Sequence, residues 1–223
     1  MTSASEEYSG PRAKILAFCG LAGVLAFSVL PIPDWLVRGS SIGNLLARET
    51  VYWGFTAVVL LWLTCAERLP LSSIGFRPLT WKGAGIGIVA AVVLTAIQIL
   101  QFAVIIPMFH LSMAAIMVRQ QAIMNTPYWY RVLLVLRAAV TEEVIFRGYL
   151  IEKVLQLSKS AALAVILSVA AFTYYHLGGW GAVQLIAVSG GGIVFALLYM
   201  WKKDLPSNIL AHFLADAAGF LTR

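Results

Sequence analysis

The stretch from Gly83 to Ile106 reads GAGIGIVAAVVLTAIQILQFAVII and contains no charged residue. A membrane-spanning helix needs roughly 20 consecutive apolar residues, so a run of this length can cross a bilayer. Lys82 stands before the run and Pro107 follows it, which bounds the expected helix. This stretch therefore predicts a transmembrane helix and sets the class of the fold.

The rest of the chain has the same apolar character. Of its 223 residues, 61% are hydrophobic and 12% are charged, whereas soluble domains carry roughly 45–50% apolar and about 25% charged residues. A chain of this length cannot hide so much apolar surface inside a water-soluble globule. The composition predicts an integral membrane protein and excludes disordered, collagen-like and coiled-coil chains.

The gaps between charged residues place further spans. We expect an all-α, polytopic membrane helix bundle of about seven transmembrane helices plus one interfacial or re-entrant helix. Residues 1–70 would form an N-terminal two-span region, and residues 71–223 a membrane-embedded core. The expected spans are 15–30, 50–66, 83–106, 127–157, 161–176, 182–201 and 205–221, with the shorter helix at 108–123.

The formal net charge of +6 comes from basic residues that are scattered along the chain, so nucleic-acid binding is not expected. With the N-terminus in the cytoplasm, ten basic residues fall in cytoplasmic segments and four in outer ones. The positive-inside rule then predicts a cytoplasmic N-terminus, in the plasma or inner membrane. The cytoplasmic group is Arg12, Lys14, Arg68, Arg77, Lys82, Arg147, Lys153, Lys159, Lys202 and Lys203, and the outer group is Arg38, Arg48, Arg119 and Arg223.

Three short motifs place polar residues on different predicted spans of the C-terminal half. They are Glu142-Glu143-x-x-x-Arg147, Phe172-x-x-x-His176 and His212-x-x-x-Asp216. Residues four apart share a helix face, so Glu143 can pair with Arg147. A charged side chain near the bilayer centre costs at least about 2.5–3.5 kcal/mol on insertion scales, so these residues are expected to face a cavity and one another.

Glu142 lies about 100° around the helix from Glu143, which leaves it without a partner in this pattern. His176 needs a partner, and Glu142 is the obvious acceptor if the spans converge. Asn208 extends the stripe of His212 and Asp216 by one turn. One carboxylate and two imidazoles can polarise a water directly or hold a divalent metal, and the remaining imidazole can donate to an oxyanion. This set is typical of peptide-bond hydrolysis.

The order EExxxR, FxxxH, HxxxD on successive predicted membrane helices resembles the CAAX protease and bacteriocin-processing (CPBP, or Abi) family of intramembrane proteases, to which the type II CAAX prenyl endopeptidases belong. Ser73-Ile-Gly-Phe-Arg-Pro78 and Leu205-Pro-Ser-Asn-Ile-Leu-Ala-His212 are also similar to stretches of that family. The likeness covers 71–221 and is strongest from Thr141 to Asp216. It implies an endopeptidase that cleaves a membrane-proximal or lipid-modified, for example prenylated, peptide or protein in the bilayer.

The resemblance also implies roles for the polar residues. Glu142 and His176 would activate the attacking water, and His212 and Asp216 would stabilise the oxyanion or complete a metal site. These four residues are the candidate ligands of a divalent metal such as zinc. The family often has asparagine where this chain has Asp216, which leaves metal-assisted and glutamate-only hydrolysis both open.

The remaining motif residues would support the site. By the same resemblance, Glu143 and Arg147 would organise the pocket and Phe172 would pack beside His176. Taken alone, the Glu143–Arg147 pair is more often a structural ion pair. Arg131 and Arg137 could snorkel or line a vestibule. We expect a hydrophilic cavity that is reached from the cytoplasmic half of the membrane.

Two other function classes fit converging polar residues. A proton- or ion-coupled transporter uses intramembrane Glu, His and Asp, but it predicts repeats in two matching halves, whereas these residues crowd one half. A catalytically inactive scaffold or immunity protein of the same fold predicts a lost motif residue, and none is lost. The hydrolase is therefore the favoured reading.

Overall fold

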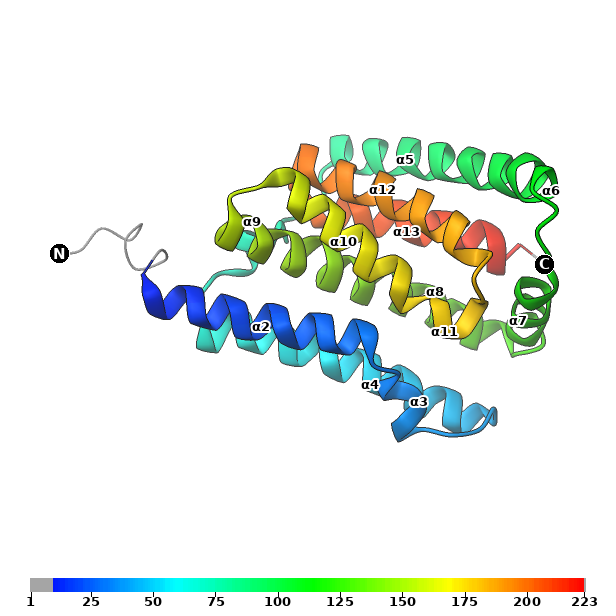
Figure 1. The fold of residues 1–223 in the computed structure, drawn as a ribbon, viewed down its shortest axis with the longest axis horizontal. Helices are drawn as coiled ribbons and strands as arrows, with labels where there is room; N and C mark the ends of the chain where they lie inside the picture. The colour runs from blue at the N-terminus through cyan, green and yellow to red at the C-terminus, as the bar shows by residue number, and fades with distance from the viewer. Residues whose placement is uncertain (1–9, 223) are drawn as a thin grey trace.

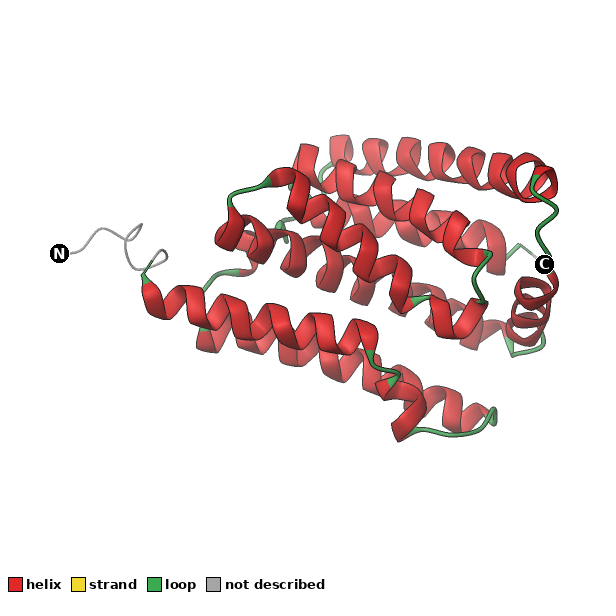
Figure 2. Cartoon of the chain, viewed as in Figure 1, coloured by secondary structure: helices red, strands yellow, loops and turns green. Residues whose placement is uncertain are grey.

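The computed structural model describes residues 10–222, and these residues form helices joined by short loops, without a strand (Figure 2). Most of the long helices lie lengthwise beside one another, and the described chain begins and ends at opposite ends of the bundle (Figure 1). Arg223 and residues 1–9, which the expectations above include, lie outside the described residues. The expected all-helical class is confirmed for the described part of the chain.

The N-terminal region holds α2 (Pro11–Val29), α3 (Ile32–Leu36) and α4 (Ile42–Leu61), which continues as the π-helix η1 (Trp62–Ala66). The rest of the described chain begins with the 3-10 turn η2 and continues with helices up to α13. Their bounds are η2 (Leu71–Ile74), α5 (Trp81–Leu100), η3 (Gln101–Ile105), α6 (Ile106–Met108), α7 (Ala114–Met124), α8 (Tyr128–Glu142), η4 (Glu143–Ile151), α9 (Glu152–Ser158), α10 (Ala161–Tyr175), α11 (Leu177–Trp180), α12 (Gln184–Lys202) and α13 (Leu205–Phe220).

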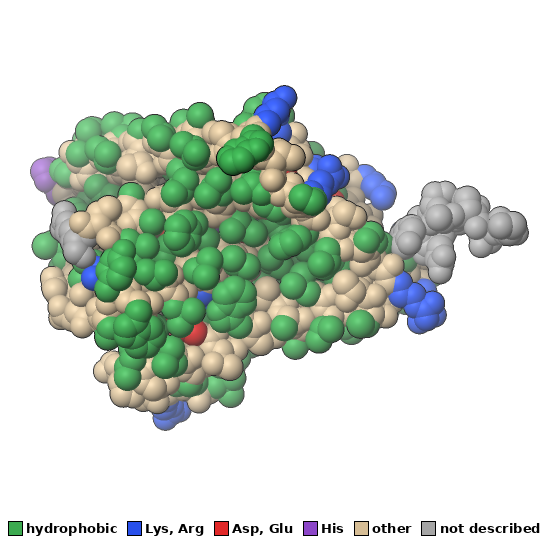
Figure 3. Space-filling view, turned by 180° about the vertical axis from the view of Figure 1, so that it is seen from behind, with side chains coloured by type: hydrophobic (Ala, Val, Ile, Leu, Met, Phe, Trp, Pro, Cys, Tyr) green, Lys and Arg blue, Asp and Glu red, His purple; other side chains and the backbone are tan. Residues whose placement is uncertain are grey.

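Four helical segments of the described chain are long and apolar enough to cross a membrane, namely Pro11–Val29, Ile42–Ala66, Trp81–Met108 and Gln184–Lys202. Hydrophobic side chains cover the middle of the face seen in Figure 3. Together these features identify an integral membrane protein. The expected number of seven spans stays a prediction, as does the division at residue 70.

The second membrane helix begins earlier than its sequence suggests. The expected span starts at residue 50 because Arg48 and Glu49 interrupt the apolar run, but α4 starts at Ile42, where the Ser41 hydroxyl accepts a hydrogen bond from the Asn44 amide. Both charges have partners. Arg48 pairs with Asp34 of α3 at 3.2 Å, and Glu49 is buried against α8. Charge inside an apolar run therefore did not end the helix here.

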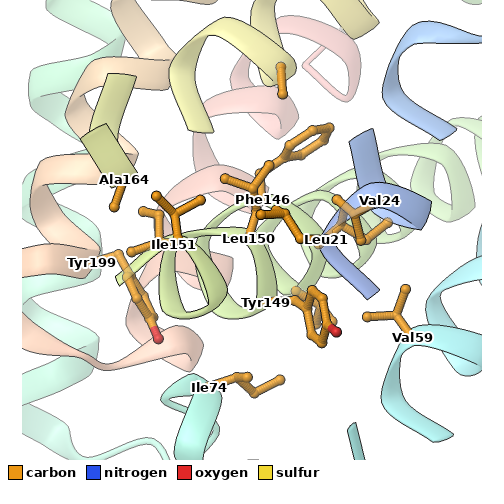
Figure 4. Packing of buried hydrophobic residues seen from close by; sticks show 14 of the residues in the cluster. Leu21, Val24, Val59, Ile74, Phe146, Tyr149, Leu150, Ile151, Ala164 and Tyr199 are labelled. Carbon is orange, nitrogen blue, oxygen red and sulfur yellow. The ribbon is translucent and has the colours of Figure 1, made fainter. Parts of the chain in front are cut away.

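The core of the bundle is built around η4, whose nine residues are all buried. Its apolar side chains pack against α2, α10 and α12 in one large hydrophobic cluster (Figure 4). Phe146 lies edge-on to Phe172 of α10, with ring centroids 5.4 Å apart. A π-helix is a rare, widened form of the α-helix that is often found at functional sites. The segment that carries the first motif is therefore also the most enclosed part of the fold.

The glycines at the start of α5 serve close packing against α13. A Cβ atom on Gly87 would lie 2.8 Å from the backbone oxygen of Ser207, and one on Gly83 would lie 2.7 Å from the Ser207 hydroxyl. Both distances are shorter than a van der Waals contact, so only glycine allows the two helices to approach this closely. This contact holds α13, with the third motif, firmly against the bundle.

Candidate active site

Three helices bring the carboxylate of Glu142 together with two imidazoles. Glu142 ends α8, His176 follows α10, and His212 lies in the middle of α13. The Oε2 atom of Glu142 lies 3.7 Å from His176 Nε2 and 3.9 Å from His212 Nε2. The spans therefore converge as the motif spacing led us to expect, and one carboxylate oxygen faces both rings.

The orientation of the His176 ring is fixed by its own helix. Its Nδ1 atom lies 2.8 Å from the backbone oxygen of Phe172, one turn earlier. A carbonyl oxygen can only accept a hydrogen bond, so Nδ1 donates to it, and Nε2 is the ring nitrogen that faces Glu142. Phe172 also contacts the ring, with centroids 4.7 Å apart. The FxxxH spacing thus positions His176 through both the backbone and the side chain of Phe172.

His212 lies between two carboxylates. Its Nδ1 atom is 2.9 Å from Glu143 Oε1, and its Nε2 atom is 3.5 Å from Asp216 Oδ2, one turn along α13. Phe195 stacks against the ring, with centroids 4.7 Å apart. Carboxylates at both nitrogens favour the imidazolium form, in which both nitrogens donate. His212 is therefore suited to donate a hydrogen bond from its Nε2–H group into the space that it shares with Glu142.

Glu143 points away from that space and is completely buried. Arg147 donates to its Oε1 atom at 2.8 Å, as the spacing of four predicted, and the side-chain amide of Asn208 donates to its Oε2 atom at 3.1 Å. Asn208 also donates to the backbone oxygen of Phe195 at 2.8 Å. The two adjacent glutamates therefore have different roles. Glu143 orients His212, whereas Glu142 faces the space that it shares with His176 and His212.

Arg147, the partner of Glu143, also contacts two aromatic rings of the site. It is fully buried, and its guanidinium lies 4.1 Å from the centroid of the Phe172 ring and 5.1 Å from that of Phe195. The positive-inside count places Arg147 among the cytoplasmic charges, and this expectation is wrong, because the side chain lies inside the bundle between α10 and α12. It connects the ring that contacts His176 with the ring that contacts His212.

Glu142 is not unpartnered, contrary to the expectation from its motif. Arg137, five residues earlier on α8, donates to Glu142 Oε1 at 3.1 Å and to Glu49 Oε2 of α4 at 2.7 Å. Tyr130 donates to the other oxygen of Glu49 at 3.0 Å. Arg137 is buried, so it does not snorkel, and it lines the cavity described below. It holds Oε1 of Glu142 and leaves Oε2 free for the histidines.

Glu49 was not among the candidate residues, although a signal for it exists. It is a carboxylate in an apolar run, and such a residue marks a functional or buried polar site in membrane helices. From the charge pattern alone, Glu49 marks only the start of the apolar run that follows it. In the structure, Glu49 joins the N-terminal region to the site through Arg137.

A cavity of about 250 Å³ reaches the site. The four residues proposed to do chemistry, Glu142, His176, His212 and Asp216, all line it, and so does Arg137. Its other walls include apolar side chains and three amides, Gln98, Gln120 and Gln184. The Oε1 atom of Gln184 is buried and has no hydrogen-bond partner among the described residues. A bound peptide could donate hydrogen bonds from its backbone N–H groups to the amide oxygens of this wall.

The donor set does not fit a metal centre in this arrangement. Among residues 10–222 no group of three or more His, Cys, Asp and Glu side chains is placed to hold a metal ion. In addition, the carboxylate of Glu142 already binds the cation of Arg137. The zinc that the resemblance allowed gains no support from the geometry, and we derive no step through it.

Comparison with known proteins supports the resemblance seen in the motifs. Residues 124–218 match the family described as Type II CAAX prenyl endopeptidase Rce1-like. The suspected family is confirmed over this segment. The segment holds all three motifs and the whole Glu142–His176–His212 cluster, so the Rce1-like family match and the geometry point to the same residues. No curated protein and no solved structure matched the chain.

The match of this segment to the Rce1-like family implies a protease and suggests one of the CAAX-type intramembrane class. The match does not reach Glu49, which lies outside residues 124–218. The contribution of the N-terminal region to the site is therefore visible only in the structure.

Proposed function

We propose that the protein is an intramembrane endopeptidase in which Glu142 is the general base for an attacking water. The observation that carries this proposal is the position of Glu142 Oε2, which faces the Nε2 atoms of two histidines at the wall of a cavity. A water hydrogen-bonded to Oε2 at about 2.8 Å also reaches the Nε2 atom of His176, which accepts a hydrogen bond when the ring is neutral. It donates one hydrogen to each and turns a lone pair toward the substrate carbonyl.

The proposed reaction follows from these positions. The water oxygen attacks the carbonyl carbon while its proton passes to Glu142, and the carbonyl oxygen becomes an oxyanion. The Nε2–H group of His212 donates to that oxyanion, which is the interaction that strengthens most in the transition state. Glu142 then gives the proton to the amide nitrogen, and the C–N bond breaks as the oxyanion re-forms a carbonyl. The products are a carboxylic acid and an amine, and the hydroxyl proton of the acid passes to the amine, so that a carboxylate and an ammonium group leave.

The other residues of the site position Glu142, His176 and His212. Glu143 holds His212, Arg137 holds Glu142, and Arg147 supports the rings of Phe172 and Phe195. The amide side chains of the cavity wall would bind the backbone of an extended peptide. The substrate proposed is a membrane-proximal or lipid-modified peptide segment, in agreement with the Rce1-like family match.

The proposal is tested with purified protein in detergent and two internally quenched peptides, one carrying a farnesylated CAAX end and one without lipid. Cleavage in ¹⁸O-labelled water should place one labelled oxygen in the new carboxyl terminus. Glu142→Gln should lower kcat about 10²–10⁴-fold. Glu67→Gln is the matched control, because Glu67 is equally enclosed but lies outside the cavity. Failure of the folded wild-type protein to cleave either peptide, or cleavage by Glu142→Gln at the wild-type rate, would contradict the proposal.

A further inference from the structure

The active-site cavity lies toward one particular end of the bundle. Of the residues that line it, Ile116 and Arg119 belong to α7, Trp180 to α11, and Phe220 ends α13. Figure 1 shows α7, α11 and the end of α13 at the end opposite the start of α2. The cavity therefore extends toward the end of the bundle that is farthest from the N-terminus.

Basic residues are distributed unequally between these two ends. Nine of the described Lys and Arg residues lie at the end where α2 starts, and four lie at the end with the cavity. The first group is Arg12, Lys14, Arg68, Arg77, Lys82, Lys153, Lys159, Lys202 and Lys203, and the second is Arg38, Arg48, Arg119 and Arg131. Figure 3 shows several Lys and Arg side chains, in blue, at the end of the bundle where α2 starts.

Aromatic side chains mark a membrane interface at each end. Trp81 and Trp201 are exposed at the end where α2 starts, while Trp35, Tyr128 and Trp129 are exposed at the other end. Tryptophan and tyrosine prefer the headgroup region on both sides of a bilayer. The bundle axis therefore runs across the membrane, and its two ends face opposite compartments.

The positive-inside rule assigns the two ends. It counts Lys and Arg near the ends of the spans and places the richer side in the cytoplasm. We propose that the active-site cavity opens on the non-cytoplasmic side of the membrane, and that its substrate is a peptide segment of an exported or membrane-anchored protein exposed on that side. The substrate part of this inference rests on the proposed function, whereas the placement of the cavity does not.

This placement resolves a conflict between two expectations from the sequence. A cytoplasmic N-terminus and a cavity reached from the cytoplasmic half cannot both hold, because the start of α2 and the cavity lie at opposite ends. The basic residues support the first and therefore not the second. Helix α7 lies at the cavity end, with Ile116 buried and Met117 and Val118 exposed, as suits a helix at the membrane surface beside the opening.

Cysteine labelling tests the placement without requiring activity. In a Cys19→Ala, Cys65→Ala background, single cysteines are introduced as Ser112→Cys at the cavity end, Ser72→Cys at the opposite end, and Ala138→Cys in the cavity wall. Spheroplasts of a bacterial expression host are treated with a membrane-impermeant maleimide, or with a charged methanethiosulfonate for the cavity position. We expect labelling of Ser112→Cys and Ala138→Cys in intact spheroplasts, and of Ser72→Cys only after permeabilisation.

The reverse pattern, or loss of Ala138→Cys labelling from the outside, would overturn the placement. A second measurement addresses the substrate: an internally quenched, sulfonated peptide library is added to right-side-out and to inverted vesicles. Cleavage should occur only in right-side-out vesicles, and cleavage confined to inverted vesicles would overturn the inference. Labelling as expected, with no cleavage in either vesicle type, would instead contradict the proposed function.

Discussion

Ion-paired glutamates occur in two regions of this bundle, and the two regions differ in a way that separates chemistry from stability. Near the cytoplasmic end proposed above, Glu67 accepts from Lys153 and from Tyr149, and Glu152 accepts from Lys203 and Tyr199. Each of these carboxylates has a lysine and a tyrosine as partners, and neither lines the active-site cavity. Burial and ion pairing alone therefore do not mark a reactive centre.

The Glu142 cluster adds two features that the other region lacks. Its partners include imidazoles, the side chains whose protonation changes most easily near neutral pH. One oxygen of Glu142 also faces a cavity, while Arg137 occupies the other. The comparison teaches that a carboxylate becomes a candidate base when a proton acceptor, a proton donor and open space meet beside it.

The largest expected effect comes from the same substitution made in both regions. Glu142→Gln removes the general base and should lower kcat about 10²–10⁴-fold, whereas Glu67→Gln should leave kcat unchanged and lower thermal stability, because Lys153 loses a charged partner. Steady-state cleavage of an internally quenched peptide and thermal unfolding in detergent measure the two. Equal loss of activity in both variants would erase the difference between the regions.

The second effect concerns the proposed oxyanion donor. His212→Gln removes the imidazolium beside the cavity and should lower kcat about 10²–10³-fold, as loss of one oxyanion-hole donor does elsewhere, with little change in KM. The matched control is Lys203→Gln, which removes the cation beside Glu152 at the other end. A His212→Gln enzyme that loses substrate affinity while keeping kcat would show that the ring binds the ground state instead.

The sequence predicted much of this arrangement and missed identifiable parts. Spacings of four placed Glu143 beside Arg147 and His212 beside Asp216, because a helix fixes which residues share a face. The free energy that it costs to place a charged side chain in the bilayer also predicts that Glu142, His176 and His212 converge. Local periodicity and the energetics of burial were sufficient for these contacts.

Contacts between distant segments could not be read in the same way. No pattern in the chain specifies that Glu49 and Arg137, which are 88 residues apart, meet beside Glu142. The π-helix η4 has no proline or other local signal that distinguishes it from an α-helix. The position of the cavity relative to the N-terminus likewise depends on how helices alternate in direction, which the motifs do not encode.

A smaller effect is expected at Glu49, which was not among the candidate residues. Glu49→Gln removes one carboxylate from Arg137, which then binds Glu142 more strongly and holds its negative charge away from the water. We expect kcat to fall about 10- to 100-fold, as for other partners that orient a reacting group, with KM unchanged. Arg48→Gln, on the same helix, breaks the partly exposed pair with Asp34 and the hydrogen bonds to the Val37 backbone oxygen, and it serves as the control. An unchanged kcat in Glu49→Gln would confine its role to packing.

The smallest effect is expected at Asp216, which lines the cavity one turn along α13 from His212. Its side chain is about one-quarter exposed, and its Oδ2 atom lies 3.5 Å from His212 Nε2, beyond the length of a good hydrogen bond. Asp216→Asn keeps an acceptor at that place and should change kcat by less than about tenfold, which corresponds to about 1.4 kcal/mol. Asp216→Ala should cost more, because it removes one of the carboxylates that face His212 and leaves Glu143 at Nδ1 and the more distant Glu142 near Nε2. If Asp216→Asn instead abolished cleavage while the protein remained folded, the carboxylate itself would be required, and the division of labour proposed between Glu142 and His212 would have to include it.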